Sequence, residues 1–145
     1  MPTTKTTQVK RVVLARMKPG EDIIETLERI ATDNGIQGGQ LNLIGAVSRA
    51  TLGYFDRKRG EYRTFTIEKD LEVVSCMGNL SRLADGTAVV HAHMVASDET
   101  GRCYGGHVMR GCEVSATIEV IITEFDTELR RARDEMTGLN LLSLE

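Results

Sequence analysis

The chain has 145 residues, a length that suits one domain with one hydrophobic core, and its formal net charge is -3. Its composition, 41% hydrophobic and 27% charged, is ordinary for a soluble protein, and no apolar run is long enough to cross a membrane. The acidic balance and the absence of Trp argue against a dedicated nucleic-acid binder, which usually presents a basic face and aromatic stacking platforms. No charged-then-apolar signal segment opens the sequence, so we expect a cytoplasmic protein.

The first third of the chain predicts a flexible start, a strand and one helix. Residues 1–8 are polar and are expected to be loose, and residues 11–17 are typical of a strand. After a Pro-Gly turn, residues 21–34 predict an amphipathic helix that ends at Gly35. Its apolar side chains recur at helical spacing and indicate a face packed on the core: Ile23, Ile24, Leu27, Ile30 and Ala31.

The next segments predict strands joined by hairpin turns. Residues 40–55 are rich in β-formers and favour either two strands or one bent strand, with the kink near residues 45–48. The run DRKRG, residues 56–60, predicts a turn into a return strand over residues 61–67. Residues 71–83 predict another strand with Gly78 as a candidate bulge, followed by an Asp-Gly hairpin turn.

All three histidines of the chain lie within VVHAHMVASDETGRCYGGHVMR, residues 89–110. His91 and His93 are two apart in a strand-like run, so their side chains share one face. The turn SDETGR then returns the chain, and a second strand brings His107 back beside them. Three converging imidazoles are the protein part of an open zinc site, whose fourth position is left for water or a ligand. The alternative is that these are ordinary half-buried strand residues.

The register of this hairpin decides whether His107 joins the pair. A four-residue loop would pair Ser97 with Arg102 and turn His107 to the opposite face. A shift of one residue restores the shared face, through a three- or five-residue loop or through a bulge. Gly105-Gly106 is the expected place for such a bulge, because glycine tolerates the backbone angles that a bulge requires.

The three cysteines are an odd number without CxxC spacing, which favours reduced thiols over a disulfide framework. Cys103 and Cys112 lie close to the histidines in sequence, so one of them is a further candidate ligand. The simpler interpretation of Cys76, Cys103 and Cys112 is that they are small buried hydrophobic residues.

The last part of the chain predicts a long strand, a short helix and an apolar tail. Residues 111–125 alternate between apolar and polar side chains, and Glu119 is a carboxylate in this partly buried run. It is either a solvent-facing residue or a partner of the histidines. Residues 127–136 are charged and predict a short helix. The leucines of residues 137–145 suggest contact with a neighbouring subunit.

One helix and about seven strands, many linked by hairpin turns, predict an α+β fold in which a helix packs on a mainly antiparallel sheet. We expect a single domain over residues 1–145. Because open sheets leave edges that must be covered, oligomerisation is also expected.

Five segments in order resemble the plants and prokaryotes conserved domain, the PPC domain: PGEDIIETL, IGAVSRATLGYFD, LEVVSCMGNLS, HAHMV and GRCYGGHV. The resemblance covers residues 11–124. It implies a compact domain that assembles as a homotrimer, and its HxH and GGH patterns imply a metal protein with His91, His93 and His107 as ligands. The fold is also similar to part of acetolactate decarboxylase, a zinc enzyme.

These expectations lead to two hypotheses about function. The first is a trimer that binds zinc, or another divalent transition metal, and has a small-molecule ligand or hydrolase- or lyase-type chemistry. Glu119 is then a candidate for moving protons, and Arg49 is a candidate for holding an anionic substrate. The second is a DNA-binding or protein-assembly module, because members of the PPC family are often described as predicted DNA-binding proteins. The chain lacks the basic AT-hook segment of the plant members, which makes autonomous DNA binding doubtful.

Overall fold

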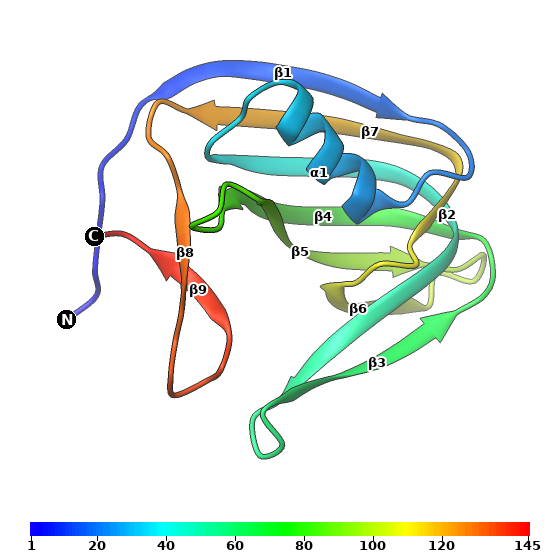
Figure 1. Ribbon diagram of the computed structural model, residues 1–145. Coiled ribbons are helices and arrows are strands. Elements are labelled where there is room, and N and C mark those ends of the chain that lie inside the picture. Colours follow the sequence, from blue (N-terminus) through cyan, green and yellow to red (C-terminus); the bar gives the residue numbers. More distant parts are fainter.

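The computed structural model describes all 145 residues as one helix and nine strands (Figure 1). In chain order these elements are β1 (Val9–Met17), α1 (Ile23–Asp33), β2 (Gly39–Asp56), β3 (Glu61–Ile67), β4 (Leu71–Arg82), β5 (Ala88–Ser97), β6 (Cys103–Val108), β7 (Glu113–Phe125), β8 (Arg130–Arg133) and β9 (Asn140–Ser143).

The strands form one sheet in the order β1-β7-β2-β6-β5-β4-β8-β9, with β3 paired to β2 and a further pairing between β2 and β4. β2 is the bent single strand that the sequence allowed. Its first half lies between β7 and β4, and its second half pairs with β3 and β6. The bend falls near Gly45, where a Cβ atom would lie 2.0 Å from the carbonyl oxygen of Thr117 on β7. A side chain would clash there, and the φ of +145° is a conformation that residues other than glycine rarely adopt, so the bend requires glycine.

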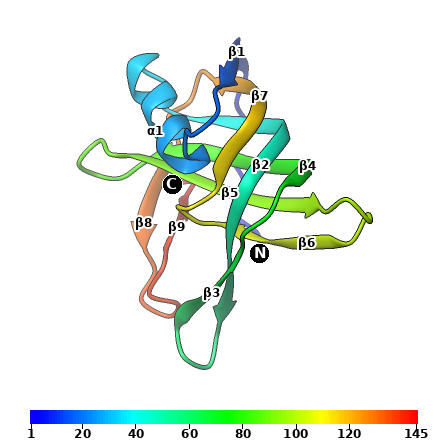
Figure 2. The same ribbon diagram turned by 90° about the vertical axis from the view of Figure 1, so that its right-hand side faces the viewer.

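α1 lies across one face of the sheet (Figures 1 and 2). Asp22 caps the helix, since its Oδ1 accepts a hydrogen bond from the amide of Glu25 at 3.0 Å. Its Oδ2 also accepts from the amides of Gly111 and Cys112, which ties the helix start to the β6–β7 connection. The expected apolar stripe is confirmed: four of its side chains join those of the sheet in a core of 25 buried residues, and Ile30 is partly buried against this core.

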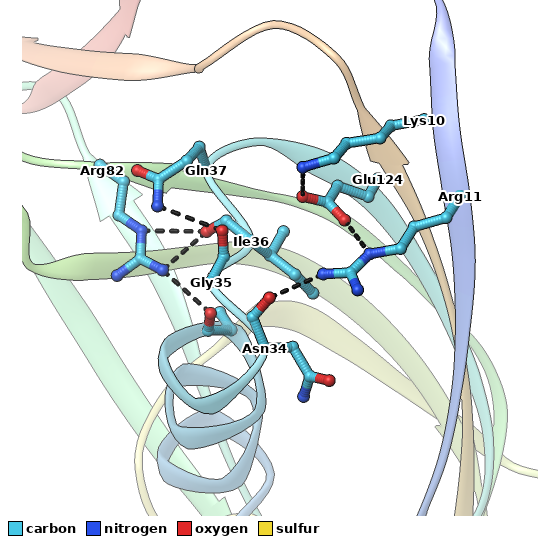
Figure 3. A network of polar contacts seen from close by, with 9 residues as sticks. Lys10, Arg11, Asn34, Gly35, Ile36, Gln37, Arg82 and Glu124 are labelled. Carbon is cyan, nitrogen blue, oxygen red and sulfur yellow. Dashed lines mark hydrogen bonds and ion pairs between the residues drawn. The ribbon is translucent and has the colours of Figure 1, made fainter.

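Two arginines bind the carbonyl groups at the end of α1 (Figure 3). Buried Arg82 donates to the carbonyl oxygen of Ile36 from Nε at 3.0 Å and from Nη2 at 2.7 Å, and to that of Ala31 at 2.9 Å. Arg11 donates to the carbonyl oxygen of Asn34 at 2.7 Å and pairs with buried Glu124. Positive charge at a helix C-terminus is favourable, because it faces the negative end of the helix dipole.

Replacing Arg82 with methionine is therefore expected to destabilise the fold by about 2–4 kcal/mol, because buried carbonyl groups lose their donors. Urea unfolding would measure the change, with exposed Arg102→Met as the matched control. Equal midpoints for the two variants would contradict this role for Arg82.

The sheet was expected to be mainly antiparallel, and it is mixed: β8 makes a parallel bridge to β4 between Arg130 and Arg82, whereas the other strand pairings are antiparallel. The predicted helix over residues 127–136 is wrong: β8 lies there and pairs antiparallel with β9. Buried Leu129 and Arg131 alternate with exposed Arg130, which is a strand period. Gly78 is not a bulge either, since the irregularity in β4 falls between Val73 and Ser75.

The ends of the chain lie near each other beside the β8–β9 hairpin (Figure 1). Residues 1–6 are exposed, but Thr7 and Gln8 hydrogen-bond to the Asp126 carboxylate, so the loose segment is shorter than expected. In the tail, Leu141 and Leu142 remain partly exposed. No helix in the structure combines the length and the apolar character that a membrane crossing needs.

Candidate metal centre

The three histidines meet on the sheet face that is turned away from α1. His91 and His93 lie on β5 and His107 lies on β6, directly opposite His93 in the register. One nitrogen from each ring falls within a cluster whose atoms all lie within 4.8 Å of one another. The Nε2 atoms of His91 and His93 are 3.3 Å apart. Imidazole groups this close suit one shared metal ion.

A five-residue loop produces this register. Ser97 pairs with Cys103, so residues 98–102 form the loop, and the β5–β6 pairing continues without irregularity to His93 and His107. The expected bulge at Gly105-Gly106 is therefore absent, and the loop-length alternative is the correct one. A Cβ atom on Gly106 would lie 2.9 Å from the carbonyl oxygen of Gly53, so this glycine allows β6 to approach β2.

Asp98 holds the loop in shape. Its Oδ1 accepts hydrogen bonds from the amides of Thr100 and Arg102 and from the hydroxyl of Thr100, at 2.7–3.0 Å. Its Oδ2 pairs with Lys69 at 2.7 Å. The hydrogen bond from Lys69, followed by those from the loop, holds the pKa of Asp98 well below its usual range. A short polar side chain that bonds the following amides is a common way to fix a turn.

Tyr62, on β3, lies against the ring of His107. Its hydroxyl oxygen lies 3.4 Å from His107 Nδ1, and the two rings are 4.6 Å apart between centroids. A hydrogen bond at Nδ1 leaves Nε2 free to bind a metal. The sequence reasoning missed Tyr62, because its place depends on the register between β2 and β3, in which Tyr62 pairs with Phe55.

Arg131 supplies positive charge beside the cluster, although no carboxylate pairs with it. It is 9% exposed and donates to Ser81 Oγ at 2.8 Å, to Asn79 Oδ1 at 2.7 Å and to the carbonyl of Asn140 at 2.9 Å. Asn79 is the cross-strand partner of His91, so the guanidinium lies near the histidines. The sequence analysis did not single out Arg131, because it predicted a helix for this segment. In the strand that is found there, Arg131 is buried and its neighbours are exposed.

Burial and positive neighbours favour the neutral form of His91 and His107. Burial lowers the pKa of His91, and the charges of Arg131 and His93 add to the effect. Burial also lowers the pKa of His107 to about 4, with smaller contributions from His91, His93 and Arg131. Neutral imidazole is the form that binds metal ions, so His91 and His107 are in the ligating state at pH 7.

His91 and His93 open into a groove of about 590 Å³ that the N-terminal segment, β4, β5 and the C-terminal tail line. Asn79 and several apolar side chains, among them Met77 and Leu142, contribute to its walls. Lys5 is the one charged side chain in the lining. A volume of this size accommodates a small organic molecule.

The other sequence candidates lie elsewhere. Arg49 donates to the carbonyl of Gly111 at 3.3 Å and lies 3.7 Å from Glu113 across β2 and β7. Glu119 is an exposed residue of β7, paired with Arg16 and Ile44. Neither contacts the histidines. All three cysteines are free thiols outside the cluster of candidate ligands, and Cys103 is exposed rather than buried as expected.

The histidines also end a row of directly paired residues that crosses the same outer face. His93 is opposite Met77 on β4, followed by Asn42 on β2, Ile121 on β7 and Leu14 on β1. Direct cross-strand partners share a face, so these side chains lie side by side. Met77, Ile121 and Leu14 are 54%, 50% and 74% exposed, which is unusual for large apolar residues in one row.

The family model of the Plants and Prokaryotes Conserved domain, abbreviated PCC or PPC, matches residues 4–126. The chain belongs to this family. Among curated proteins, the chain is similar to the bifunctional protein GlmU of Synechococcus sp. (strain JA-3-3Ab), with 32% identity over 137 residues. This match covers 93% of the chain but 21% of that relative, so the chain spans about a fifth of its length.

Solved PPC structures resemble the chain over nearly its whole length. A metal-containing protein from Archaeoglobus fulgidus has 31% identity and a TM-score of 0.89, covering 98% of this chain and 99% of the other. A PPC protein from Pyrococcus horikoshii has 27% identity and a TM-score of 0.89, covering 98% and 97%. A protein from Ralstonia eutropha, described as a candidate DNA-binding protein, has 26% identity and a TM-score of 0.83, covering 91% and 90%.

Acetolactate decarboxylase from Bacillus subtilis shares the fold alone. It has 13% identity and a TM-score of 0.52, and the match covers 83% of this chain and 54% of the enzyme. The expected resemblance of the PPC fold to part of this enzyme is thus confirmed at the level of architecture.

Proposed function

We propose that this PPC protein binds one divalent transition metal, most simply zinc, through His91, His93 and His107. The observation that carries the proposal is the convergence of three imidazoles within 4.8 Å on one face. Two nitrogens that each lie 2.0–2.1 Å from a tetrahedral zinc ion are about 3.3 Å apart, which is close to the separation of the His91 and His93 Nε2 atoms. The metal-containing relative from Archaeoglobus supports the same assignment.

Three neutral ligands would leave the ion with its full positive charge and an open position. Such an ion polarises a carbonyl oxygen or lowers the pKa of a bound water. The adjacent groove gives a small molecule access to that position. The proposed role is therefore small-molecule binding, or hydrolase- or lyase-type chemistry, at a three-histidine metal centre. Elemental analysis of the purified protein tests it: about one metal ion per chain is expected, and a metal-free protein that also fails to bind added zinc would refute it.

Metal loading and stability should both decline in mild acid. Unfolded histidines titrate near pH 6.5, whereas the folded pKa of His91 is lowered and that of His107 lies at about 4. The unfolded chain thus binds more protons below pH 6.5, so this stability is complete above that pH and is lost as pH falls. For the metal-free protein we expect a loss of about 1 kcal/mol between about pH 7 and about pH 5.5, after allowance for solvent screening.

Urea unfolding at the two pH values measures this effect. The variant with all three histidines replaced by alanine is the matched control, because the chain has no other histidine. An identical pH dependence in the control would assign the loss to other groups.

We further propose that the protein is a homotrimer. The family resemblance supports this state, and so do the exposed apolar row from Leu14 to Met77 and the partly exposed leucines of β9. The outer face of the sheet would then be the subunit contact, and the metal centre would lie at the border of this contact.

A second candidate function is DNA binding. It is favoured by the relative from Ralstonia and by the basic tip of the β2–β3 hairpin, where Arg57, Lys58 and Arg59 are exposed. The net charge of -3 opposes it, because DNA affinity comes largely from neutralising phosphates. In a fluorescence anisotropy titration at physiological salt we expect weak binding to duplex DNA. Submicromolar, sequence-selective binding would replace the proposed function with this one.

A further inference from the structure

The charge around the groove beside the histidines is one-sided. The chain has 21 acidic residues and a net charge of -3, yet no Asp or Glu contributes to the groove lining. Lys5 lies at the groove, and Arg131 lies behind Asn79, which is part of its wall. A bound divalent ion would add two more positive charges. Walls that carry one sign of charge attract ligands of the opposite sign.

Arg131 is the strongest element of this field. A guanidinium has five N–H donors, and three hydrogen bonds to neutral acceptors occupy three of them. A charge with little exposure to water is costly, and for Arg131, as for Arg82, hydrogen bonds to neutral oxygens offset this cost without cancelling the charge. Here no acidic group of the chain pairs with Arg131, and its Nη2 donates to Asn79, the cross-strand partner of His91. A negative partner from outside the chain would complete the arrangement.

The groove walls define the rest of the ligand. Six of the fourteen lining residues are hydrophobic, which suits a carbon skeleton better than a bare inorganic ion. We propose that the groove binds a small organic carboxylate, with one carboxylate oxygen at the open position of the metal and with its charge balanced by Arg131 and Lys5. This inference rests on the proposed metal centre and names the ligand class of that centre.

Cobalt-substituted protein tests the ligand class without any assumed reaction, because the visible spectrum of Co²⁺ reports ligands that enter its coordination sphere. The probes are acetate, oxalate, inorganic phosphate and neutral acetamide. We expect acetate and oxalate to change the spectrum in a saturable way and acetamide to leave it unchanged. Phosphate that binds more tightly than either carboxylate, or acetamide that binds equally well, would overturn the proposal.

Variants that remove a positive charge near the groove test which residues contribute to carboxylate binding. Replacing exposed Lys5 with glutamine should weaken oxalate binding about threefold, whereas Lys58→Gln at the distant hairpin tip should not change it. Arg131→Gln should weaken it about tenfold, and Arg131→Lys, which keeps the charge, should lose less. Equal oxalate affinity in native protein, Lys5→Gln and folded Arg131→Gln would reject a role for this field.

Failure of the metal centre and failure of the carboxylate site give different results. A protein that takes up no cobalt contradicts the proposed function. A protein that takes up one cobalt per chain but whose spectrum no carboxylate changes contradicts only the ligand assignment, and it would mean that protein groups or a neighbouring copy fill the fourth position.

Discussion

Replacing His91, His93 or His107 with alanine is expected to weaken metal binding by more than about 100-fold, so that each purified single variant carries little metal. The loss is large because a three-ligand site has no spare donor: the chain has no other histidine, and the cysteines lie outside the cluster. Elemental analysis after dialysis against a weak chelator would measure the occupancy of each variant.

The same variants should keep the fold. His93 is exposed and the other two rings are partly buried on the outer face, so alanine opens no cavity in the core beneath α1. Met77→Leu is the matched control, since Met77 is the cross-strand partner of His93 and has no ligand atom of the imidazole or thiolate type. If the triple alanine variant retains one metal per chain, the ligands lie elsewhere and the proposed centre is wrong.

The native protein should have a mass of about 48 kDa in solution, three times the 16.0 kDa chain, and lysine at both Leu14 and Ile121 should reduce it to the mass of one chain. These residues are 74% and 50% exposed and are direct neighbours across β1 and β7. Exposed apolar side chains gain most from burial in a contact, and two buried unpaired charges would cost more than such a contact can supply.

Light scattering coupled to size exclusion measures both masses. Tyr54→Lys is the matched control, because Tyr54 is 65% exposed but lies on the β2–β3 hairpin, away from the outer row. A native protein that is monomeric at micromolar concentration would refute the trimer. Deleting residues 137–145 separately tests the apolar tail, whose loss should leave a trimer if the outer row is the main contact.

Local patterns predicted most of the elements, because they depend on side chains close together in sequence. The helix was expected over residues 21–34 and is found at Ile23–Asp33, since its apolar spacing, its Asp22 cap and Gly35 all act within a few residues. The shared face of His91 and His93 follows from the strand period alone. The approach of His107 to His91 and His93 was also predicted, but the sequence did not decide whether the loop length or a bulge produces the required register.

Long-range contacts explain what was missed. The segment of residues 127–136 is charged and locally helix-like, but Arg131 finds its acceptors on β4 and on the far side of the β8–β9 hairpin. Tyr62 reaches His107 only because β2 bends and pairs with both β3 and β6. Such tertiary contacts override local propensity, and no spacing within a single segment reveals them.

The sheet order also has a consequence for how the chain folds. β1, the first strand to be made, pairs with β7 alone, and β7 lies between β1 and β2. During synthesis β1 therefore has no strand to pair with until residues 113–125 have emerged. Folds whose pairings join distant segments form slowly, typically in milliseconds to seconds for small domains. A nascent chain that stops before β7 should thus leave the apolar residues of β1 and α1 exposed. We therefore expect the domain to complete its sheet only after β7 has been synthesised.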